Sequence, residues 1–291
     1  MTVLETIQKS ADFLSKKGVE SPRLQAELLL AHVLKLPRMK LYLNFERQLS
    51  DKETNVMREC ECVKRRGQRE PLQHILGSTS FCGLEIIVNR HVLVPRPETE
   101  LLTEAGWEFL STVGSQSPTV LDFGTGSGCI AIALAVKCSI CRVTALEASQ
   151  EALEIAKQNA AQNQVGDRMD FIKGDKVSAL PSDSRFDLII SNPPYIPSAE
   201  IASLQPEVRD FDPRAALDGG VDGLDFHRMF AEKATSFLSP DGRIMLEFGD
   251  GQAEVVKAIF MEQKWIVEAI KEDYSRQPRI LIARSSSCPP S

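Results

Sequence analysis

The chain is poor in the features that mark membrane, disulfide-bonded and metal-binding proteins. Its apolar residues, 43% of 291, form no run near the roughly 18 that a membrane-spanning helix requires. The seven cysteines lack the spacing of a disulfide framework, and the four histidines lack that of metal ligands. Cys138 and Cys141 form a lone CxxC ahead of a predicted strand, whereas the redox motif opens a helix. Cys60 and Cys62, two apart on a predicted helix, cannot face each other. The sequence therefore disfavours a metal or redox function.

An excess of positive charge is also missing. The net charge is −6, which argues against nucleic-acid binding by the chain as a whole, but it is uneven: residues 1–72 carry +4 and the remainder −10. The basic run Lys64–Arg66 is interpreted as a solvated helix end. Glu5 and Asp12 lie among the first apolar residues, unlike the acid-poor targeting segments, so we expect a cytoplasmic protein without membrane contact.

The first seventy residues have the pattern of a small helical bundle. Helical spacing of apolar residues predicts helices over 2–17, 22–36, 39–44 and 50–66, with caps at Thr2, Ser21 and Ser50. After Pro71 the period changes, and 75–77 with 81–88 predict a hairpin. We therefore predict a helical domain over 1–72, a hairpin linker over 73–95 and a larger domain over 96–291.

The larger domain alternates helices and strands, which is typical of an α/β fold. Arg96 and Glu98 lie in a proline-rich turn before the first of its helices, and we interpret them as caps of that helix rather than ligands. The predicted helices are 99–112, 129–136, 150–163, 225–238 and 250–263, and the predicted strands are 119–123, 142–146, 169–173, 186–190, 242–248, 265–270 and 278–284.

One turn stands out at the end of the apolar strand 186–190. It contains Asn192, Pro193, Pro194 and Tyr195, at the kind of strand end where open α/β sheets bind ligands. Each proline fixes φ and removes an N–H, so the carbonyl oxygens of the turn are held in place, while Asn192 adds an amide and Tyr195 a flat ring. Such a corner suits a small planar group that carries an NH2.

A glycine-rich loop follows the strand that ends at Phe123. It contains Gly124, Thr125, Gly126, Ser127 and Gly128, so its backbone can approach a ligand closely. Its G-x-G-x-G spacing is neither the dinucleotide fingerprint nor a P-loop. Glu147 ends the next strand, where an acid can accept from both hydroxyls of a ribose.

With the glycine loop, the strand-end acid and Asn-Pro-Pro-Tyr in this order, the chain resembles the S-adenosylmethionine-dependent methyltransferases, specifically the release-factor N(5)-glutamine methyltransferases of the HemK/PrmC type. The likeness covers nearly the whole chain, including Val94–Glu100 and the loop from Pro213 to Leu224. It implies a helical substrate-recognition domain followed along the chain by a seven-stranded Rossmann-like α/β domain. The substrate implied is the glutamine in the Gly-Gly-Gln loop of class I peptide release factors. A monomer is expected.

The resemblance also implies the site. The loop Gly124–Gly128 would wrap the methionine part of the cofactor, beside Phe123, and Glu147, which stands where the family usually has Asp, would hold the ribose hydroxyls. Lys176 stands where bacterial relatives can carry an aromatic residue. The catalytic residues implied are Asn192, Pro193, Pro194 and Tyr195, with Asn192 touching both cofactor and substrate amide.

Other functions remain open on the sequence. The turn alone is shared with enzymes that methylate amino groups of adenine, guanine or glutamine, so a ribosomal-protein glutamine methyltransferase and a nucleic-acid amino methyltransferase are alternatives. A nucleic-acid substrate predicts a basic face, which a net −10 in the larger domain disfavours. An inactive cofactor-binding module would be expected to have a damaged turn, and Asn192–Tyr195 is intact.

Overall fold

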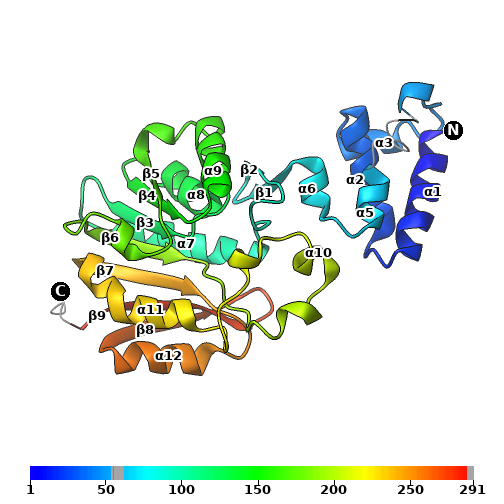
Figure 1. Ribbon diagram of the computed structural model, residues 1–291. Coiled ribbons are helices and arrows are strands. Elements are labelled where there is room, and N and C mark those ends of the chain that lie inside the picture. The colour runs from blue at the N-terminus through cyan, green and yellow to red at the C-terminus, as the bar shows by residue number, and fades with distance from the viewer. Residues whose placement is uncertain (54, 56–61, 287–291) are drawn as a thin grey trace. The chain divides into compact units, whose positions relative to one another are not determined.

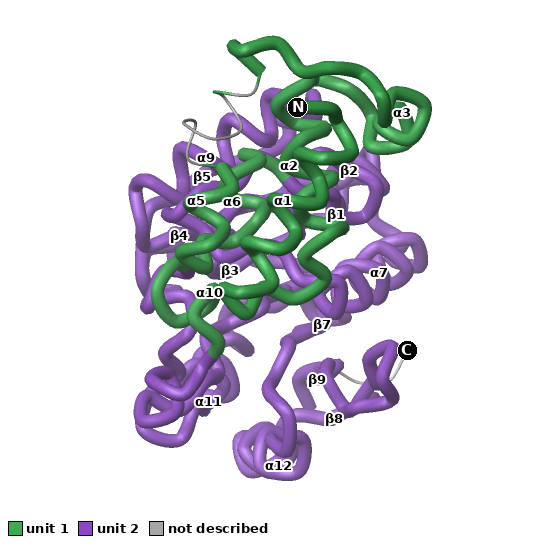
Figure 2. Tube along the Cα trace, turned by 90° about the vertical axis from the view of Figure 1, so that its right-hand side faces the viewer, with its two compact units in different colours: residues 1–78, 205–211 green, residues 79–204, 212–291 purple. Residues whose placement is uncertain are grey.

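The structure, a computed structural model, describes residues 1–53, 55 and 62–286, and it divides into two compact units (Figures 1 and 2). We call Met1–Ser78 together with Gln205–Phe211 the helical unit, and Thr79–Leu204 with the chain from Asp212 onward the sheet unit. The predicted domain boundaries stay a prediction. What the structure adds is that a short segment far along the chain belongs to the helical unit.

Short helices around one apolar core make up the helical unit. They are α1 (Val3–Lys16), α2 (Pro22–Leu34), α3 (Arg38–Tyr42), α5 (Cys62–Gly67), α6 (Leu72–Leu76) and α10 (Pro206–Arg209). The predicted cap of α1 is present: Thr2 and Glu5 exchange hydrogen bonds between side chain and backbone, which satisfies donors that a first helical turn leaves free. The core takes Ile7 and Leu14 from α1 and Leu29 and Leu30 from α2.

Three predictions for the helical unit were wrong. Arg66, expected at a solvated helix end, is buried and pairs with Glu207 at 2.7 Å. Ser21 has φ +46° and makes no side-chain cap, so α2 begins at Pro22 without one. Ile75–Leu76, expected in a strand, lies in α6, because the chain after the proline closes helical hydrogen bonds. The predicted capping box over Ser50–Glu53 is present. The rest of the predicted 50–66 helix falls partly on residues 54 and 56–61, including Cys60, which lie outside the described residues.

A seven-stranded sheet in the order β5-β4-β3-β6-β7-β9-β8 organises the sheet unit, as the resemblance implied. Neighbouring strands are parallel except that β9 is antiparallel to both β7 and β8. The strands are β3 (Thr119–Phe123), β4 (Arg142–Glu147), β5 (Met169–Lys173), β6 (Phe186–Ser191), β7 (Leu238–Glu247), β8 (Trp265–Glu272) and β9 (Pro278–Ser285), and β1 (Ser78–Phe81) with β2 (Leu84–Ile87) forms a separate hairpin.

Helices cover both faces of this sheet (Figure 1). Leu188 and Ile190 of β6 point into the core on one face and Ile189 into the core on the other, as strand alternation requires. The first face carries α7 (Pro97–Thr112), α8 (Cys129–Lys137) and α9 (Gln150–Gln162), and the second carries α11 (Asp225–Lys233) and α12 (Ala253–Glu262). Short 3₁₀ turns are η1 (Gly166–Arg168), η2 (Val177–Ala179), η3 (Ile201–Ser203), η4 (Arg214–Ala216) and η5 (Ala234–Phe237).

The sequence misplaced one junction. The helix predicted over 225–238 ends at Lys233 and continues as η5, because β7 already begins at Leu238. The turn expected at 239–242 lies inside β7, where the pairing with β6 shifts register between Leu238 and Arg243. Among the described residues there is no helix with the length and apolar composition that crossing a bilayer requires.

Candidate active site

The carboxyl ends of β3 and β6 lie side by side at the point where the strand order reverses. The two strands pair in parallel, and the Ser191 hydroxyl at the end of β6 donates to the Phe123 carbonyl at the end of β3 over 2.7 Å. The glycine-rich loop and the Asn-Pro-Pro-Tyr turn therefore leave the sheet as neighbours. This is the crevice in which open α/β sheets bind ligands.

The glycine-rich loop has a backbone that other residues tolerate poorly. Gly124, Gly126 and Gly128 have φ of +69°, +55° and +81°. A Cβ added to Gly124 would meet no atom within 4 Å, so this stretch of backbone faces open space. A Cβ on Gly128 would come within 3.1 Å of the Ala156 Cβ, so this glycine allows close packing instead.

The buried side chain of Asp122 holds the glycine-rich loop in place through hydrogen bonds. Its buried Oδ2 accepts from the Thr125 hydroxyl at 2.6 Å and from the Ala131 N–H of α8 at 3.2 Å. Burial raises the pKa of Asp122 to about 7, although both hydrogen bonds favour the charged form. The sequence predicted Thr125 as a cofactor contact; in the structure its side chain turns inward to this carboxylate.

Glu147 ends β4 beside the loop. Its Oε2 accepts from the Gly126 N–H and its Oε1 from the Ser149 N–H, both at 2.9 Å. Each oxygen keeps a second lone pair, and the side chain lines the cavity described next. Glu147 is therefore oriented to accept from two further hydroxyl groups.

A cavity of about 310 Å³ lies against these strand ends. This volume is in the range of small-molecule sites. The rings of Phe123 and Phe226 contribute aromatic walls. Of the predicted site residues, those that line it are Phe123, Gly124, Gly126, Glu147, Asn192, Pro193 and Pro194, and those that are not among its lining residues are Thr125, Ser127, Gly128, Lys176 and Tyr195.

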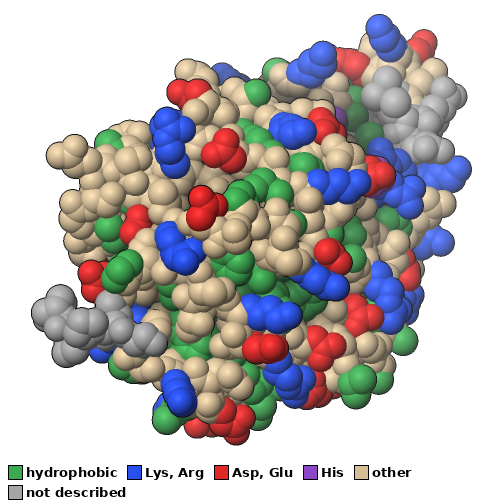
Figure 3. Space-filling model, turned by 60° about the vertical axis from the view of Figure 1, so that its left-hand side comes forward, with side chains coloured by type: hydrophobic (Ala, Val, Ile, Leu, Met, Phe, Trp, Pro, Cys, Tyr) green, Lys and Arg blue, Asp and Glu red, His purple; other side chains and the backbone are tan. Residues whose placement is uncertain are grey.

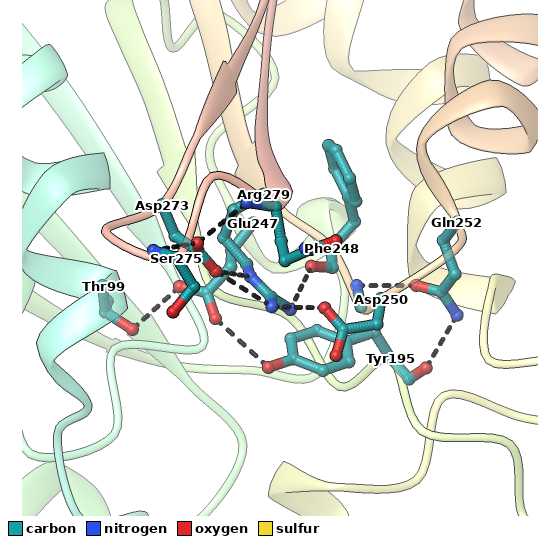
Figure 4. Close-up of polar contacts among 11 residues, drawn as sticks. Thr99, Tyr195, Glu247, Phe248, Asp250, Gln252, Asp273, Ser275 and Arg279 are labelled. Atoms are coloured by element: carbon teal, nitrogen blue, oxygen red, sulfur yellow. Dashed lines mark hydrogen bonds and ion pairs between the residues drawn. The ribbon is translucent and has the colours of Figure 1, made fainter.

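The side chain of Asn192 is held by a relay of hydrogen bonds. Its Nδ2 donates to the Thr99 Oγ1 at 3.0 Å, and the Thr99 hydroxyl donates to the Glu247 Oε2 at 2.8 Å. The other oxygen of Glu247 accepts from the Tyr195 hydroxyl at 3.2 Å, so Glu247 lies between Thr99 and Tyr195 (Figure 4). One carboxylate thus connects both polar side chains of the predicted catalytic turn.

Tyr195 is anchored at its backbone as well. Its carbonyl accepts from the Gln252 Nε2 at 2.9 Å, and the Gln252 Oε1 accepts from the Gly249 N–H at 2.8 Å (Figure 4). Burial raises the pKa of Tyr195, and the charge of Glu247 adds to this, so the phenol stays protonated and donates.

Glu247 is buried at the end of β7 without a cation bonded to it among the described residues. Burial raises its pKa to about 7, against the hydrogen bonds from Thr99 and Tyr195 and the charge of Arg279. Arg279 is bonded elsewhere, to Asp250, to Asp273 at 3.2 Å and to the Phe248 carbonyl at 3.2 Å (Figure 4).

Sequence reasoning missed Thr99 and Glu247. Thr99 was present in the proline-rich turn but was treated as the start of a helix, and Glu247 was not singled out, although a carboxylate ending an apolar strand is a signal. Arg96 occupies the predicted N-cap position of α7 and Glu98 lies in its first turn, but the Arg96 side chain makes no cap hydrogen bond and pairs with the buried Asp212 at 2.8 Å.

A mostly parallel seven-stranded sheet that reverses its order between β3 and β6, a cavity against that reversal and a match to a methyltransferase family model together place the protein in a class, the S-adenosylmethionine-dependent methyltransferases. Residues 5–77 match the model of the PrmC N-terminal domain, and residues 103–204 match that of the methyltransferase small domain. The release factor glutamine methyltransferase of Geobacter sulfurreducens is 45% identical over 259 residues, which are 89% of this chain and 88% of that protein. That of Chlorobaculum tepidum is 44% identical, with 87% and 88% covered. The chain belongs to the release factor glutamine methyltransferase family.

Solved structures support the fold. A methyltransferase from Pyrococcus furiosus superposes with a TM-score of 0.50 at 21% identity, covering 81% of this chain and 98% of that one. The hMettl16 catalytic domain, solved in complex with a MAT2A 3′UTR hairpin, gives a TM-score of 0.54 at 17% identity and covers 81% and 82%. At these identities the likeness concerns the fold alone.

Proposed function

We propose that this protein transfers a methyl group from S-adenosylmethionine to the side-chain amide nitrogen of the glutamine in the Gly-Gly-Gln motif of class I peptide release factors. The observation that carries the proposal is the position of Asn192 and Pro193, which line the cavity next to the glycine-rich loop in a chain of this family. Donor and acceptor sites for methyl transfer are thereby adjacent.

The residues present fit the cofactor. Glu147 has an accepting position free on each oxygen for a ribose diol, the open backbone at Gly124 admits a close ligand, and Phe123 and Phe226 offer apolar walls for a purine. The loop residues Thr125, Ser127 and Gly128 act on this cofactor through the shape of the backbone. Lys176 is exposed and is the predicted contact with the least support.

Positioning is the main chemical task. An amide nitrogen is a poor nucleophile because its lone pair is delocalised into the carbonyl, and the cofactor supplies a methyl carbon made electrophilic by a sulfonium. The Asn192 side-chain oxygen and the Pro193 carbonyl accept from the two N–H groups of the glutamine and aim its nitrogen at that carbon. Alignment of this kind supplies up to about 7–11 kcal/mol. S-adenosylmethionine, when bound, would supply the methyl group and keep the sulfur as a neutral thioether, and the amide nitrogen would release its proton to water.

Tyr195 orients the glutamine from its other side in this proposal. Its hydroxyl is bonded to Glu247 and its carbonyl to Gln252, so the ring has little freedom and offers a flat face to the planar amide. Pro194, the residue before Tyr195 in the chain, lines the cavity and removes an N–H that would compete for the acceptors.

A protein substrate is favoured over nucleic acid by charge. The chain has a net charge of −6, and on the face that Figure 3 presents, basic and acidic side chains are interspersed with hydrophobic ones. Nucleic-acid binding draws on clustered basic residues. The basic excess of the first 72 residues suits recognition of the release factor at a surface away from the glutamine.

Incubation with S-adenosylmethionine labelled in its methyl group tests the proposal. A purified class I release factor should gain one methyl group, located by mass spectrometry on the glutamine of its Gly-Gly-Gln motif. A release factor with glutamate in place of that glutamine, a ribosomal-protein preparation and total RNA serve as alternative acceptors. Label in any of these in place of the release factor would overturn the proposal.

A further inference from the structure

The hydrogen-bond relay between Asn192 and Glu247 has a direction, which follows from counting protons. When it is ionised, Glu247 can only accept, so its 2.8 Å bond requires the single hydroxyl proton of Thr99. The Thr99 oxygen is then left with lone pairs alone. The group of Asn192 that faces it at 3.0 Å must therefore be the NH2, and not the side-chain oxygen.

This direction decides what Asn192 offers to a ligand. With its NH2 turned to Thr99, its Oδ1 is the free end, and Asn192 lines the cavity. The amide nitrogen of a glutamine carries two protons, and its delocalised lone pair does not accept hydrogen bonds. It therefore needs a hydrogen-bond acceptor from the site. An Asn192 rotated by half a turn would place NH2 against NH2, leaving donors without partners in a largely enclosed site.

The same carboxylate also sets the second side chain of the turn. Tyr195 donates to Glu247 Oε1 while Thr99 donates to Oε2, so the two oxygens divide between two elements, the turn and α7. In the described part of the chain, no cation is bonded to either oxygen of Glu247. Arg279, which lies nearby, is bonded to Asp250, Asp273 and a backbone carbonyl instead. Glu247 is therefore available as a shared acceptor.

We infer that Thr99 and Glu247 are positioning residues for methyl transfer: through the direction of their hydrogen bonds they fix Asn192 with its oxygen toward the substrate amide and hold Tyr195 in register with it. Neither touches the reacting atoms. The inference rests on the proposed function, because it assumes a substrate that donates N–H. It predicts that the Thr99 hydroxyl, rather than the volume of its side chain, is what the site requires.

The chain provides a matched control one helical turn away. Thr103 is also a fully buried threonine of α7, but its hydroxyl donates to the Thr99 carbonyl at 3.0 Å and not to the relay. Thr99→Val and Thr103→Val each remove one buried hydroxyl from the same helix at nearly constant volume. They differ in that only Thr99→Val interrupts the connection to Asn192.

The test measures kcat and KM on the intact release factor at saturating S-adenosylmethionine, with cofactor affinity from calorimetry. Thr99→Val should lower kcat on the order of 10²-fold, the loss expected for a misoriented reacting group, with KM and cofactor affinity nearly unchanged. Thr99→Ser, which keeps the hydroxyl, should restore most of the rate, and Thr103→Val should keep it. Equal kcat losses in the two valine variants, or no loss in Thr99→Val, would overturn the inference.

A readout without substrate separates this inference from the proposed function. In ¹⁵N-labelled protein with S-adenosylmethionine bound, the side-chain NH2 signals of Asn192 can be identified by their loss in Asn192→Ala. They should shift in Thr99→Val and stay in place in Thr103→Val, whichever acceptor substrate the enzyme proves to use. Signals that stay in place in Thr99→Val would contradict the relay, whereas a wild-type enzyme inactive on the release factor would contradict only the proposed function.

Discussion

The helical unit and the strand ends of the sheet unit hold their carboxylates in different ways. In the helical unit, Glu207 of α10 accepts from two arginines of the bundle, Arg66 at 2.7 Å and Arg69 at 2.6 Å. Glu27 of α2, 3% exposed in its side chain, likewise has Arg38 at 3.1 Å. These are ion pairs in which a delocalised cation matches a carboxylate.

In the sheet unit, the carboxylates at the strand ends accept from neutral donors. Asp122, Glu147 and Glu247 are bonded to hydroxyl groups and backbone N–H groups. The consequences differ accordingly. Burial alone would raise the pKa of Glu207, but the hydrogen bonds from Arg69 and Arg66 outweigh it and hold that pKa below its usual range. Burial raises the pKa of Asp122 and of Glu247 to about 7. Pairing with two arginines therefore keeps Glu207 charged, whereas Asp122 and Glu247, which have neutral donors, change protonation near pH 7, and both support the candidate site. Asp212 is intermediate, because burial raises its pKa to about 6 although Arg96 is bonded to it.

Removing the side chain of Asn192, which ends the hydrogen-bond relay, should produce the largest loss of kcat. Asn192→Ala leaves Thr99 and Glu247 in place but deletes the acceptor for the substrate amide. We expect kcat to fall by about 10²–10³-fold, as for other preorganised groups at a reacting centre, while cofactor affinity changes little. Single-turnover methylation and calorimetry on the same sample measure both. Near wild-type turnover would refute the role assigned to the turn.

The next effect concerns cofactor binding. Glu147→Gln replaces two accepting oxygens by one oxygen and one NH2, which must face either the Gly126 N–H or the Ser149 N–H, donor against donor. Affinity for S-adenosylmethionine should weaken by about 1.5–3 kcal/mol, since a charged acceptor is lost. Calorimetry measures this, with Glu154→Gln, an exposed glutamate of α9 bonded to Gln150 and Lys157, as a control expected to bind normally. Unchanged affinity in Glu147→Gln would remove this carboxylate from the ribose site.

A pH titration should show whether the neutral-donor carboxylate controls turnover. As pH falls through about 7, Glu247 gains a proton and becomes a donor, so the relay loses its single direction. At saturating cofactor, kcat should fall about tenfold for each unit below that pKa. Glu247→Gln should have a low kcat that no longer varies over this range. A pH-independent wild-type kcat from 6 to 8 would contradict the role of Glu247.

Other groups around Glu247 do not change charge in this range. The pKa of Tyr195 is raised by burial, and burial lowers the pKa of His227, whose Nε2 lies 3.0 Å from the Glu247 carbonyl, to about 4. Asp122 does titrate near 7, but it supports the cofactor loop, so saturating cofactor and the Glu247→Gln control separate the two. The charged groups that face Glu247 from neighbouring elements are Glu98 of α7 and Arg279 of β9, the latter with Asp250 and Asp273 bound to it.

Local patterns were sufficient to predict most of the sheet unit. The apolar run before Asn192 and the glycines after Phe123 predicted two strand ends, and a general rule for open sheets brought them together at the cavity. Strand boundaries were accurate where a buried strand has turn residues on both sides. The turn expected at 239–242 was wrong: these residues lie in β7, and the register shift in its pairing with β6 leaves no mark in either sequence.

The sequence could not predict residues that act on the site through other side chains. Thr99 and Glu247 are separated by 148 positions, and only the packing of α7 on the end of β7 brings their side chains together. Glu207 lies 141 positions from Arg66, in a segment that the sequence assigned to the larger domain. The spacing of apolar residues predicts which face of a helix or strand is buried. It does not predict which polar side chain of another element will contact that face.

The smallest effect that we predict concerns the stability of the helical unit. It tests directly how a carboxylate bonded to arginines differs from one bonded to neutral donors. Glu207→Gln removes the charge that two arginines share, while the bonds of Arg66 to Gln25 and to the Glu70 carbonyl remain. The helical unit should lose about 1–3 kcal/mol, as for hydrogen bonds to charged groups. Both tryptophans, at 107 and 265, lie in the sheet unit, so hydrogen exchange of α1 and α2 amides is the measurement suited to this unit. Glu46→Gln, an exposed site in the same unit, is the control.

The sign of the pH dependence completes the test. Because the folded pKa of Glu207 is held below the ordinary 4.5, its contribution is present above pH 4.5 and is lost as pH falls further, so wild type and Glu207→Gln should converge in acid. The pKa of Glu247 is raised from 4.5 to about 7, so its protonated form favours the fold, and wild type should lose stability relative to Glu247→Gln as pH rises from 4.5 to 7. Slopes of the same sign in the two comparisons would mean that arginine pairing does not distinguish these carboxylates. Slopes of opposite sign would show that ionised Glu247 lowers the free energy of unfolding near pH 7. This is the pH range in which we expect ionised Glu247 to orient Thr99 and Asn192.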